Sequence, residues 1–218
     1  MKVKTIFLWL TLLVLASCAS RTEPIPVPAP ELGVTPASAD WWRPDPGLTW
    51  QWQLSDLPIS TSIDADVYDI DLFESDARVV EALQDQGRRV ICYFSAGSWE
   101  DWRPDADKFP EEVIGKDYEG WQGEKWLDIR RIDLLAPIMR ERLDLCKAKG
   151  FDGVEPDNID IHLNDTGFLL TYADQLAYAK WLANEAHARG LAIGIKNAPE
   201  MIMDALSCFD FAITEDAF

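Results

Sequence analysis

Residues that bind transition metals or build a histidine-based catalytic triad are scarce in this sequence. It contains two histidines, His162 and His187, and four cysteines among 218 residues, and no pair of cysteines has the spacing of a metal site. These counts argue against a zinc enzyme and against a Ser-His-Asp hydrolase. We therefore expect neither a metal nor any other cofactor.

Positive charge is scarce as well. Lysine and arginine number 20 against 38 aspartates and glutamates, which gives a formal net charge of -18. Such a surface repels the phosphate backbone, so we do not expect nucleic acid as a partner. The charge is compatible with a cationic ligand, and equally with acidity that serves solubility alone. The ten tryptophans and five tyrosines are compatible with sugar-stacking platforms and with ordinary core packing.

Long apolar runs are absent after the N-terminus. Lys2 and Lys4 precede an apolar run over residues 6–15, which is too short for a comfortable membrane span and has the order of an export signal. The run ends in Leu15-Ala16-Ser17-Cys18, which resembles a bacterial lipoprotein box. We expect residues 1–17 to be the signal peptide and Cys18 to carry the lipid. A plain secretory signal is the alternative.

The segment at residues 18–40 lacks a periodic apolar face and holds five prolines. This composition is typical of an extended, semi-rigid tether. Ala19 is not the aspartate that signals inner-membrane retention, so we expect an outer-membrane anchor in the bacterial cell envelope, or secretion. The remaining residues, 41–218, suffice for one folded domain, which we expect to be a monomer.

Three cysteines remain after Cys18, so at least one of them must be free. Cys92 and Cys146 lie in apolar runs. We predict that both are core thiols rather than partners in a disulfide.

From Trp41 onward, short apolar strands alternate with helical patterns. We predict strands at residues 49–54, 67–73, 89–95, 126–129, 151–154, 191–195 and 209–214. Three times a helix ends at a glycine that precedes a strand, at Gly87, Gly150 and Gly190. This alternation predicts parallel strands with crossover helices, and about seven of them favour an α/β (β/α)8 TIM barrel. The last βα unit is missing, so we expect a barrel truncated before that unit. Residues 96–125 form a long insertion of the kind that often carries function.

Polar residues follow almost every predicted strand. In a barrel these carboxyl ends of strands hold the chemistry. The residues concerned are Asp69, Asp71, Tyr93, Ser95, Asp128, Arg130, Glu155, Asp157, Lys196, Asn197 and Glu215. For Asp128 and Arg130 a structural salt bridge is the alternative. Lys196 is expected to neutralise the acids, or to keep one of them ionised by lowering its pKa.

Four carboxylates gather in nine residues, Asp152, Glu155, Asp157 and Asp160. Neighbours two apart on a strand share a face, so Glu155 and Asp157 point to the same side. A solvated acidic loop or a calcium site is the alternative, although the glycine and terminal glutamate of a calcium loop are missing. Two carboxylates on separate strand ends suit glycosidic cleavage, with Glu215 paired to Asp157 or Glu155.

Five motifs occur in register: Tyr68-Asp69-Ile70-Asp71, residues 91–97 (ICYFSAG), residues 126–130 (WLDIR), residues 151–158 (FDGVEPDN) and residues 194–197 (GIKN). Over residues 42–218 the chain thereby resembles glycoside hydrolase family 114, the endo-alpha-1,4-polygalactosaminidases. The resemblance implies a barrel that cleaves galactosamine-containing polysaccharide, whose free amines are cationic. By position it implies that Asp157 and Glu215 are the catalysts, with Glu155 competing for the first role.

We expect the substrate to be contacted by further polar and aromatic residues, namely Asp69, Asp71, Tyr93, Ser95, Trp99, Asp128, Arg130, Asn158, Asp160, Lys196 and Asn197. The assignment of nucleophile and acid/base stays open between the two catalysts. A non-catalytic polysaccharide-binding lipoprotein with a degenerate barrel is the alternative function, and a metal-dependent phosphodiesterase is a third.

Overall fold

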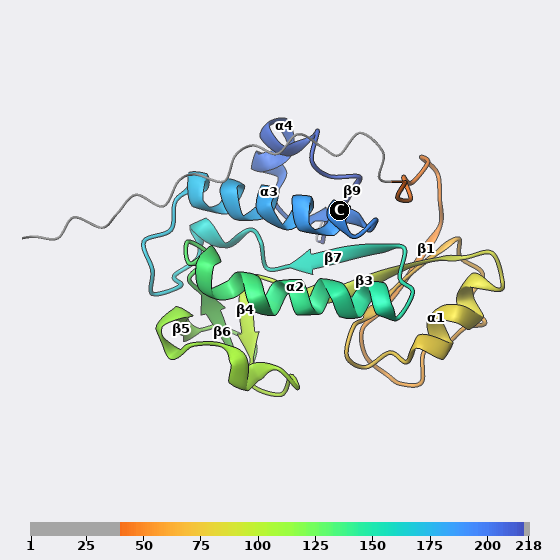
Figure 1. The fold of residues 1–218 in the computed structure, drawn as a ribbon, viewed down its shortest axis with the longest axis horizontal. Coiled ribbons are helices and arrows are strands. Elements are labelled where there is room, and N and C mark those ends of the chain that lie inside the picture. The colour runs from red at the N-terminus through yellow and green to blue at the C-terminus, as the bar shows by residue number, and fades with distance from the viewer. Residues whose placement is uncertain (1–39, 216–218) are drawn as a thin grey trace, which may run out of the picture. The chain divides into compact units, whose positions relative to one another are not determined.

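The computed structural model describes residues 40–215 (Figure 1). The predicted signal peptide, Cys18, all but the last residue of the predicted tether, and residues 216–218 lie outside this part. None of the helices within residues 40–215 has the length and apolarity needed to cross a membrane.

The central element is a sheet of six parallel strands in the order β1-β2-β3-β7-β8-β9. The strands are β1 (Trp50–Gln53), β2 (Val67–Asp71), β3 (Arg89–Ser95), β7 (Gly153–Asp157), β8 (Ala192–Lys196) and β9 (Phe211–Ile213). Every residue of β2 and β8 is buried, as expected for strands covered on both faces. Among the described residues the sheet is open between β1 and β9, and its parallel strands with crossover helices confirm the predicted α/β barrel class.

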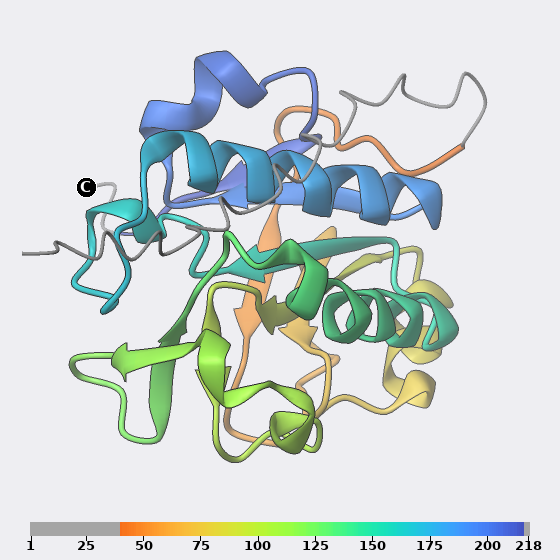
Figure 2. The ribbon, with the colours of Figure 1, turned by 60° about the vertical axis from the view of Figure 1, so that its left-hand side comes forward.

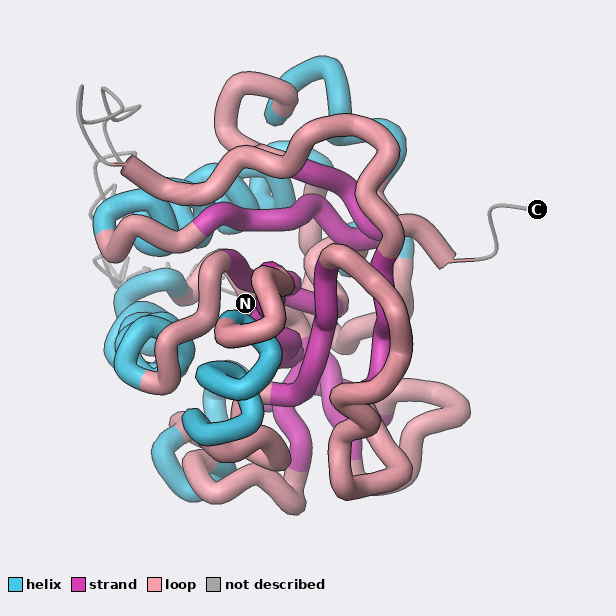
Figure 3. Tube along the Cα trace, turned by 90° about the vertical axis from the view of Figure 1, so that its right-hand side faces the viewer, coloured by secondary structure: helices cyan, strands magenta, loops and turns pink. Residues whose placement is uncertain are grey.

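Crossover helices pack on the outer face of this sheet (Figure 3). They are α1 (Ala77–Gln84), α2 (Ile132–Ala148), α3 (Tyr172–Ala188) and the short α4 (Ile202–Ala205). In α2, Leu135, Met139, Leu143 and Cys146 recur at helical spacing and are buried, so one stripe of the helix faces the core. α3 begins with a capping box, in which Thr171 and Asp174 satisfy each other's backbone N–H groups.

The insertion at residues 96–125 folds with the two residues after it into a second, antiparallel sheet of order β4-β6-β5. Its strands are β4 (Ser98–Glu100), β5 (Ile114–Asp117) and β6 (Glu124–Leu127), with short 3-10 turns at Ala106–Lys108 and Glu111–Val113. Figures 1 and 2 show this sheet on the other side of the molecule from α3 and α4. Two further 3-10 turns, Ile161–Leu163 and Pro199–Met201, follow β7 and β8.

The predicted fourth barrel strand at residues 126–129 is wrong. Trp126 and Leu127 belong to β6, and β3 pairs directly with β7, so the main sheet has six strands within residues 40–215 rather than the predicted seven. An apolar run as short as this one fits either sheet. Ser98, just after β3, supplies the nearer partner and pairs with Trp126.

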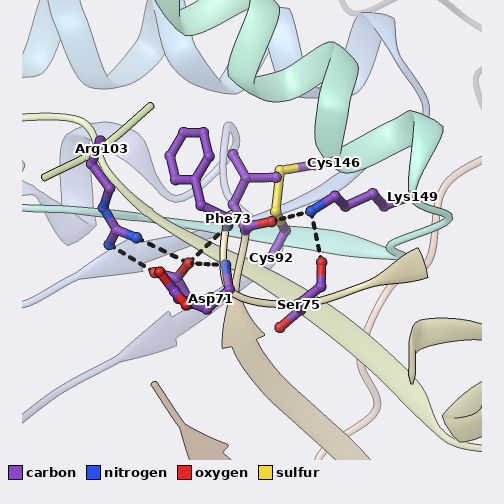
Figure 4. The surroundings of a disulfide bond; sticks show 9 residues. Asp71, Phe73, Ser75, Cys92, Arg103, Cys146 and Lys149 are labelled. Carbon is purple, nitrogen blue, oxygen red and sulfur yellow. Dashed lines mark hydrogen bonds and ion pairs between the residues drawn. A yellow bond between two sulfur atoms is a disulfide. The ribbon is translucent and has the colours of Figure 1, made fainter. Parts of the chain in front are cut away.

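The prediction for two of the cysteines is also wrong. Cys92 in β3 and Cys146 in α2 form a disulfide that ties the helix to the sheet (Figure 4). Their apolar runs place both sulfurs in the same buried interface, with the Cα atoms 6.0 Å apart, which is within disulfide range. Cys208 is a free thiol in the described part of the chain.

Candidate active site

The ammonium group of Lys196 contacts the carboxylates of all three residues that the sequence predicts as candidate catalysts. Lys196 Nζ lies 2.7 Å from Glu155 Oε1, 3.1 Å from Asp157 Oδ1 and 3.6 Å from Glu215 Oε2. Burial opposes the charge on Lys196, but the three carboxylates outweigh it and raise the lysine pKa. Lys196 is therefore a fixed cation.

Strand geometry explains the convergence. Glu155 and Asp157 lie two residues apart on β7 and share one face, while Lys196 ends the neighbouring β8. Glu215 follows β9, the next strand of the sheet. Because parallel strands end at the same edge, residues far apart in sequence meet there.

Residues at the end of β3 fix the position of Asp157. Strand β3 pairs with β7 on the side opposite β8. The hydroxyl of Tyr93 donates to Asp157 Oδ2 over 2.9 Å, and the N–H groups of Ala96 and Gly97 both donate to the Asp157 carbonyl. Burial and the charge of Asp157 raise the pKa of Tyr93, so its phenol stays protonated and remains a donor. The carboxylate is thus fixed by Lys196 on one oxygen and Tyr93 on the other.

Glu215 is held by Asn197. Asn197 Nδ2 donates to Glu215 Oε2 over 2.7 Å, and the Glu215 N–H donates back to Asn197 Oδ1 over 2.9 Å. Asn197 has φ of +51°, in the left-handed region that asparagine tolerates better than most residues. The Glu215 side chain is 45% exposed and that of Asp157 is 17% exposed, so both are reachable by a ligand.

Glu155 and Asp69 form a layer beneath Asp157. Both are fully buried, and Glu155 Oε2 and the two Asp69 oxygens are sealed from solvent. Burial, and then the negative charge of Glu155, raise the pKa of Asp69 far above its usual range. A protonated Asp69 that donates to Glu155 Oε2 gives a partner to two of these three oxygens, one on each residue. Neither residue has surface that a ligand could contact, so their predicted direct roles are wrong. Glu155 instead positions Lys196 over 2.7 Å, and Asp69 packs beside Glu155.

The two accessible acids line one cavity of about 170 Å³. Four other predicted residues also line it, Tyr93, Asn158, Asp160 and Asn197. The sequence reasoning missed Trp52, Leu54, Tyr118, Trp121 and Glu124. The last three lie in the insertion that we predict to be functional, where the sequence pattern points to Trp99 and not to these residues.

A second cavity of about 640 Å³ adjoins the first. The two share four lining residues, Leu54, Tyr93, Trp121 and Glu124. The acids therefore lie in one part of a longer cleft.

The end of β3 and the turn after β7 fit closely together at Asn158. Asn158 has φ of +62°, and its Nδ2 donates to Ser95 Oγ, Ser98 Oγ and Glu124 Oε1 over 2.9, 3.1 and 3.2 Å. A Cβ on Gly97 would lie 1.7 Å from the Asn158 carbonyl oxygen, so only glycine fits there. Ser95 is buried, and its predicted substrate contact is corrected to support of Asn158.

Four other predicted contacts lie away from the two acids. Asp71 is paired with Arg103 over 2.7 Å and lines only the second cavity. Trp99 donates from Nε1 to the Ala106 carbonyl over 2.9 Å and lines neither cavity.

Asp128 and Arg130 also line neither cavity. They form a salt bridge of 2.7 Å with each other, so the alternative of a structural ion pair is correct for them and the predicted substrate contact is not. In the described ranges, no group of three or more His, Cys, Asp or Glu side chains has the arrangement of a metal site.

The family comparison matches every residue that the structure describes. The model of glycoside-hydrolase family GH114 covers residues 32–218. The chain belongs to family GH114. This membership confirms the predicted glycosidase class. A search of curated protein sequences finds no match.

Solved structures agree with the family. The crystal structure of Aspergillus fumigatus Ega3 in complex with galactosamine is 46% identical, with a TM-score of 0.78, and the match covers 81% of this chain and 70% of Ega3. The glycoside hydrolase domain of PelA from Pseudomonas aeruginosa is 16% identical, with a TM-score of 0.58. That match covers 77% of this chain and 66% of the PelA domain, and it shows the fold alone.

Proposed function

We propose that this GH114 protein is an endo-acting glycosidase that cleaves alpha-1,4-linked galactosamine polymer with Asp157 and Glu215 as its two catalytic carboxylates. The observation that carries the proposal is their convergence on Lys196 Nζ, at 3.1 and 3.6 Å, beside a single cavity. Glycosidic cleavage requires two carboxyl groups that flank one linkage.

The spacing of the two acids favours retention of anomeric configuration. Asp157 Oδ1 and Glu215 Oε2 cannot lie farther apart than about 6.7 Å, the sum of their distances to Lys196 Nζ. Carboxyl groups of retaining enzymes lie about 5–5.5 Å apart, and those of inverting enzymes about 6.5–9.5 Å apart. This upper limit includes the whole retaining range and reaches only the lower end of the inverting range, so it supports retention without excluding inversion.

The surroundings of each acid favour one assignment of roles. Lys196 and Tyr93 stabilise negative charge on Asp157, which suits the nucleophile that attacks the anomeric carbon. Glu215 is more exposed, lies farther from Lys196 Nζ at 3.6 Å, and accepts from the neutral amide of Asn197, which suits an acid that protonates the leaving oxygen. Water, deprotonated by Glu215, then displaces Asp157 from the sugar and restores both groups.

Two observations support the proposed substrate class, the negative charge of this chain and its similarity to Ega3. The chain has a formal net charge of -18, and the cavity with the two acids also contains Asp160 and Glu124. A polymer of free amino sugars is cationic and complements this surface. Ega3, 46% identical, was crystallised with galactosamine.

A digest with product analysis tests the proposal. The protein is incubated with deacetylated alpha-1,4-galactosamine polymer, and products are sized by mass spectrometry while the first-formed anomer is followed by NMR. We expect oligomers of several lengths in the alpha configuration. Binding to the polymer without any oligomers would contradict the proposal and select the non-catalytic alternative.

We also propose that the protein is an envelope lipoprotein anchored through Cys18. The sequence order of charge, apolar run and Leu15-Ala16-Ser17-Cys18 supports this. Cys18→Ser should abolish labelling by a radioactive fatty acid and release the protein from the membrane fraction. Labelling that persists in this variant would refute the anchor.

A further inference from the structure

Glu124 occupies the junction of the two cavities and has no role in the mechanism above. It lies in β6 of the insertion and lines both the cavity with the catalytic acids and the larger adjoining one. The residue is 6% exposed, so most of its surface is withdrawn from water.

The two oxygens of Glu124 have different surroundings. Oε1 accepts from the Ser98 hydroxyl and from Asn158 Nδ2, which fixes the side chain. No hydrogen bond to Oε2 forms within residues 40–215, and Oε2 does not belong to the polar atoms sealed in the interior. Since the residue lines the cavities, the free oxygen is the part of Glu124 that a ligand can reach.

Glu124 also has no cationic partner among the described residues. Lysine and arginine side chains in the described part of the chain form no ion pair with it, in contrast to Glu155 with Lys196. Burial raises its pKa to about 7, against a smaller lowering by the Ser98 hydroxyl. Burying a carboxylate without a counter-charge is costly, and a cationic ligand would remove that cost.

The surroundings of Glu124 suit an amino sugar. Trp121 lines both cavities, and the residue is 62% exposed, so an aromatic face is available beside the carboxylate. The larger cavity is also lined by Asp56 and Glu74, while Arg103, the one cation among its described lining residues, is held by Asp71 and Glu100. The charge available to a ligand there is negative.

We propose that Glu124 is a specificity residue whose Oε2 binds the ammonium group of a sugar residue that spans the junction of the two cavities. This assignment rests on the proposed function and deepens it. An N-acetyl group replaces the cation with a neutral, larger group and leaves the carboxylate unpaired. Glu124 would thus make the enzyme prefer a deacetylated sugar next to the linkage that is cleaved.

Kinetics on two polymers test the assignment. Wild type, Glu124→Gln and the exposed control Glu119→Gln, which lies in the same insertion, are compared on fully deacetylated and on N-acetylated galactosamine polymer. A charge-assisted hydrogen bond is worth roughly ten- to a hundredfold in binding. We expect Glu124→Gln to raise KM for the deacetylated polymer about tenfold or more, to change kcat less, and to reduce the preference over the acetylated polymer. Glu119→Gln should match wild type.

A second variant keeps the test decisive if Glu124→Gln folds poorly. Glu124→Asp retains the negative charge on a side chain that is one methylene shorter. We expect its preference for the deacetylated polymer to lie between those of wild type and Glu124→Gln. Equal preference in wild type and the variants, or equal losses on both polymers with a lowered melting temperature, would overturn the assignment alone. A wild-type protein that cleaves neither polymer would overturn the proposed function and this assignment with it.

Discussion

Lys196 Nζ lies 3.1 Å from Asp157 Oδ1, and the lysine side chain is 1% exposed. A buried cation at this position compensates the charges of Asp157 and Glu155 together. Removing one partner of a buried ion pair costs about 3–5 kcal/mol, because the remaining charge is left uncompensated.

We therefore expect Lys196→Met to destabilise the protein by about 3 kcal/mol or more and to lower kcat at least about a hundredfold. Denaturant unfolding and polymer cleavage measure the two effects. Lys116→Met is the control, because its ion pair with Asp165 is exposed and should contribute less than about 1 kcal/mol. Equal behaviour of the two variants would show that the buried contact does not matter.

Tyr93→Phe removes the hydroxyl that donates to Asp157 Oδ2 over 2.9 Å. The ring keeps its packing, so we expect a stability loss of about 1 kcal/mol. The nucleophile loses one of its two fixed partners, so kcat should fall about ten- to a hundredfold while KM changes less. A rise in KM with unchanged kcat would instead place Tyr93 in substrate binding.

Gly97→Ala tests the close approach between β3 and the turn after β7. Its new Cβ would lie 1.7 Å from the Asn158 carbonyl oxygen, which forces the backbone apart. We expect a loss of more than about 3 kcal/mol in unfolding free energy and a loss of activity. Gly120→Ala, where φ is +92° but the space is open, should cost only about 1–2 kcal/mol. Similar costs for both variants would contradict the contact.

Glu124 makes stability depend on pH in a defined direction. Its folded pKa is about 7, above the value of about 4.3 expected in the unfolded chain, so the folded state binds more protons between these values. Stability from this group is fully present below about pH 4 and is lost as pH rises through 7. The melting temperature of wild type should thus fall more from pH 5 to pH 8 than that of Glu124→Gln. A parallel fall in both proteins would refute the raised pKa, and Glu119→Gln should behave like wild type.

The barrel class could be predicted because its strands are short apolar runs that end in polar residues. Alternation along β7 correctly placed Glu155 and Asp157 on one face. Alternation gives the face of a residue and not its depth, so the burial of Glu155 and Asp69 could not be foreseen.

The strand pairing of the insertion could not be predicted from the sequence for a related reason. Trp126 and Leu127 are apolar enough for either sheet, and their partner is chosen by tertiary contacts. Trp121 and Glu124 therefore had no predictable place in the cleft. The pairing of Cys92 with Cys146 is likewise a matter of connectivity, which spacing alone does not determine.

The most direct test of the two-carboxylate account is a double-mutant cycle in kcat on deacetylated galactosamine polymer. Asp157→Asn and Glu215→Gln should each lower kcat by at least about a thousandfold, and both variants should still bind the polymer. The kcat of the double variant should be hardly lower than that of either single variant, because the effects of residues that act as a unit are not additive. Substantial turnover in either single variant, or losses that multiply in the double variant, would contradict the account.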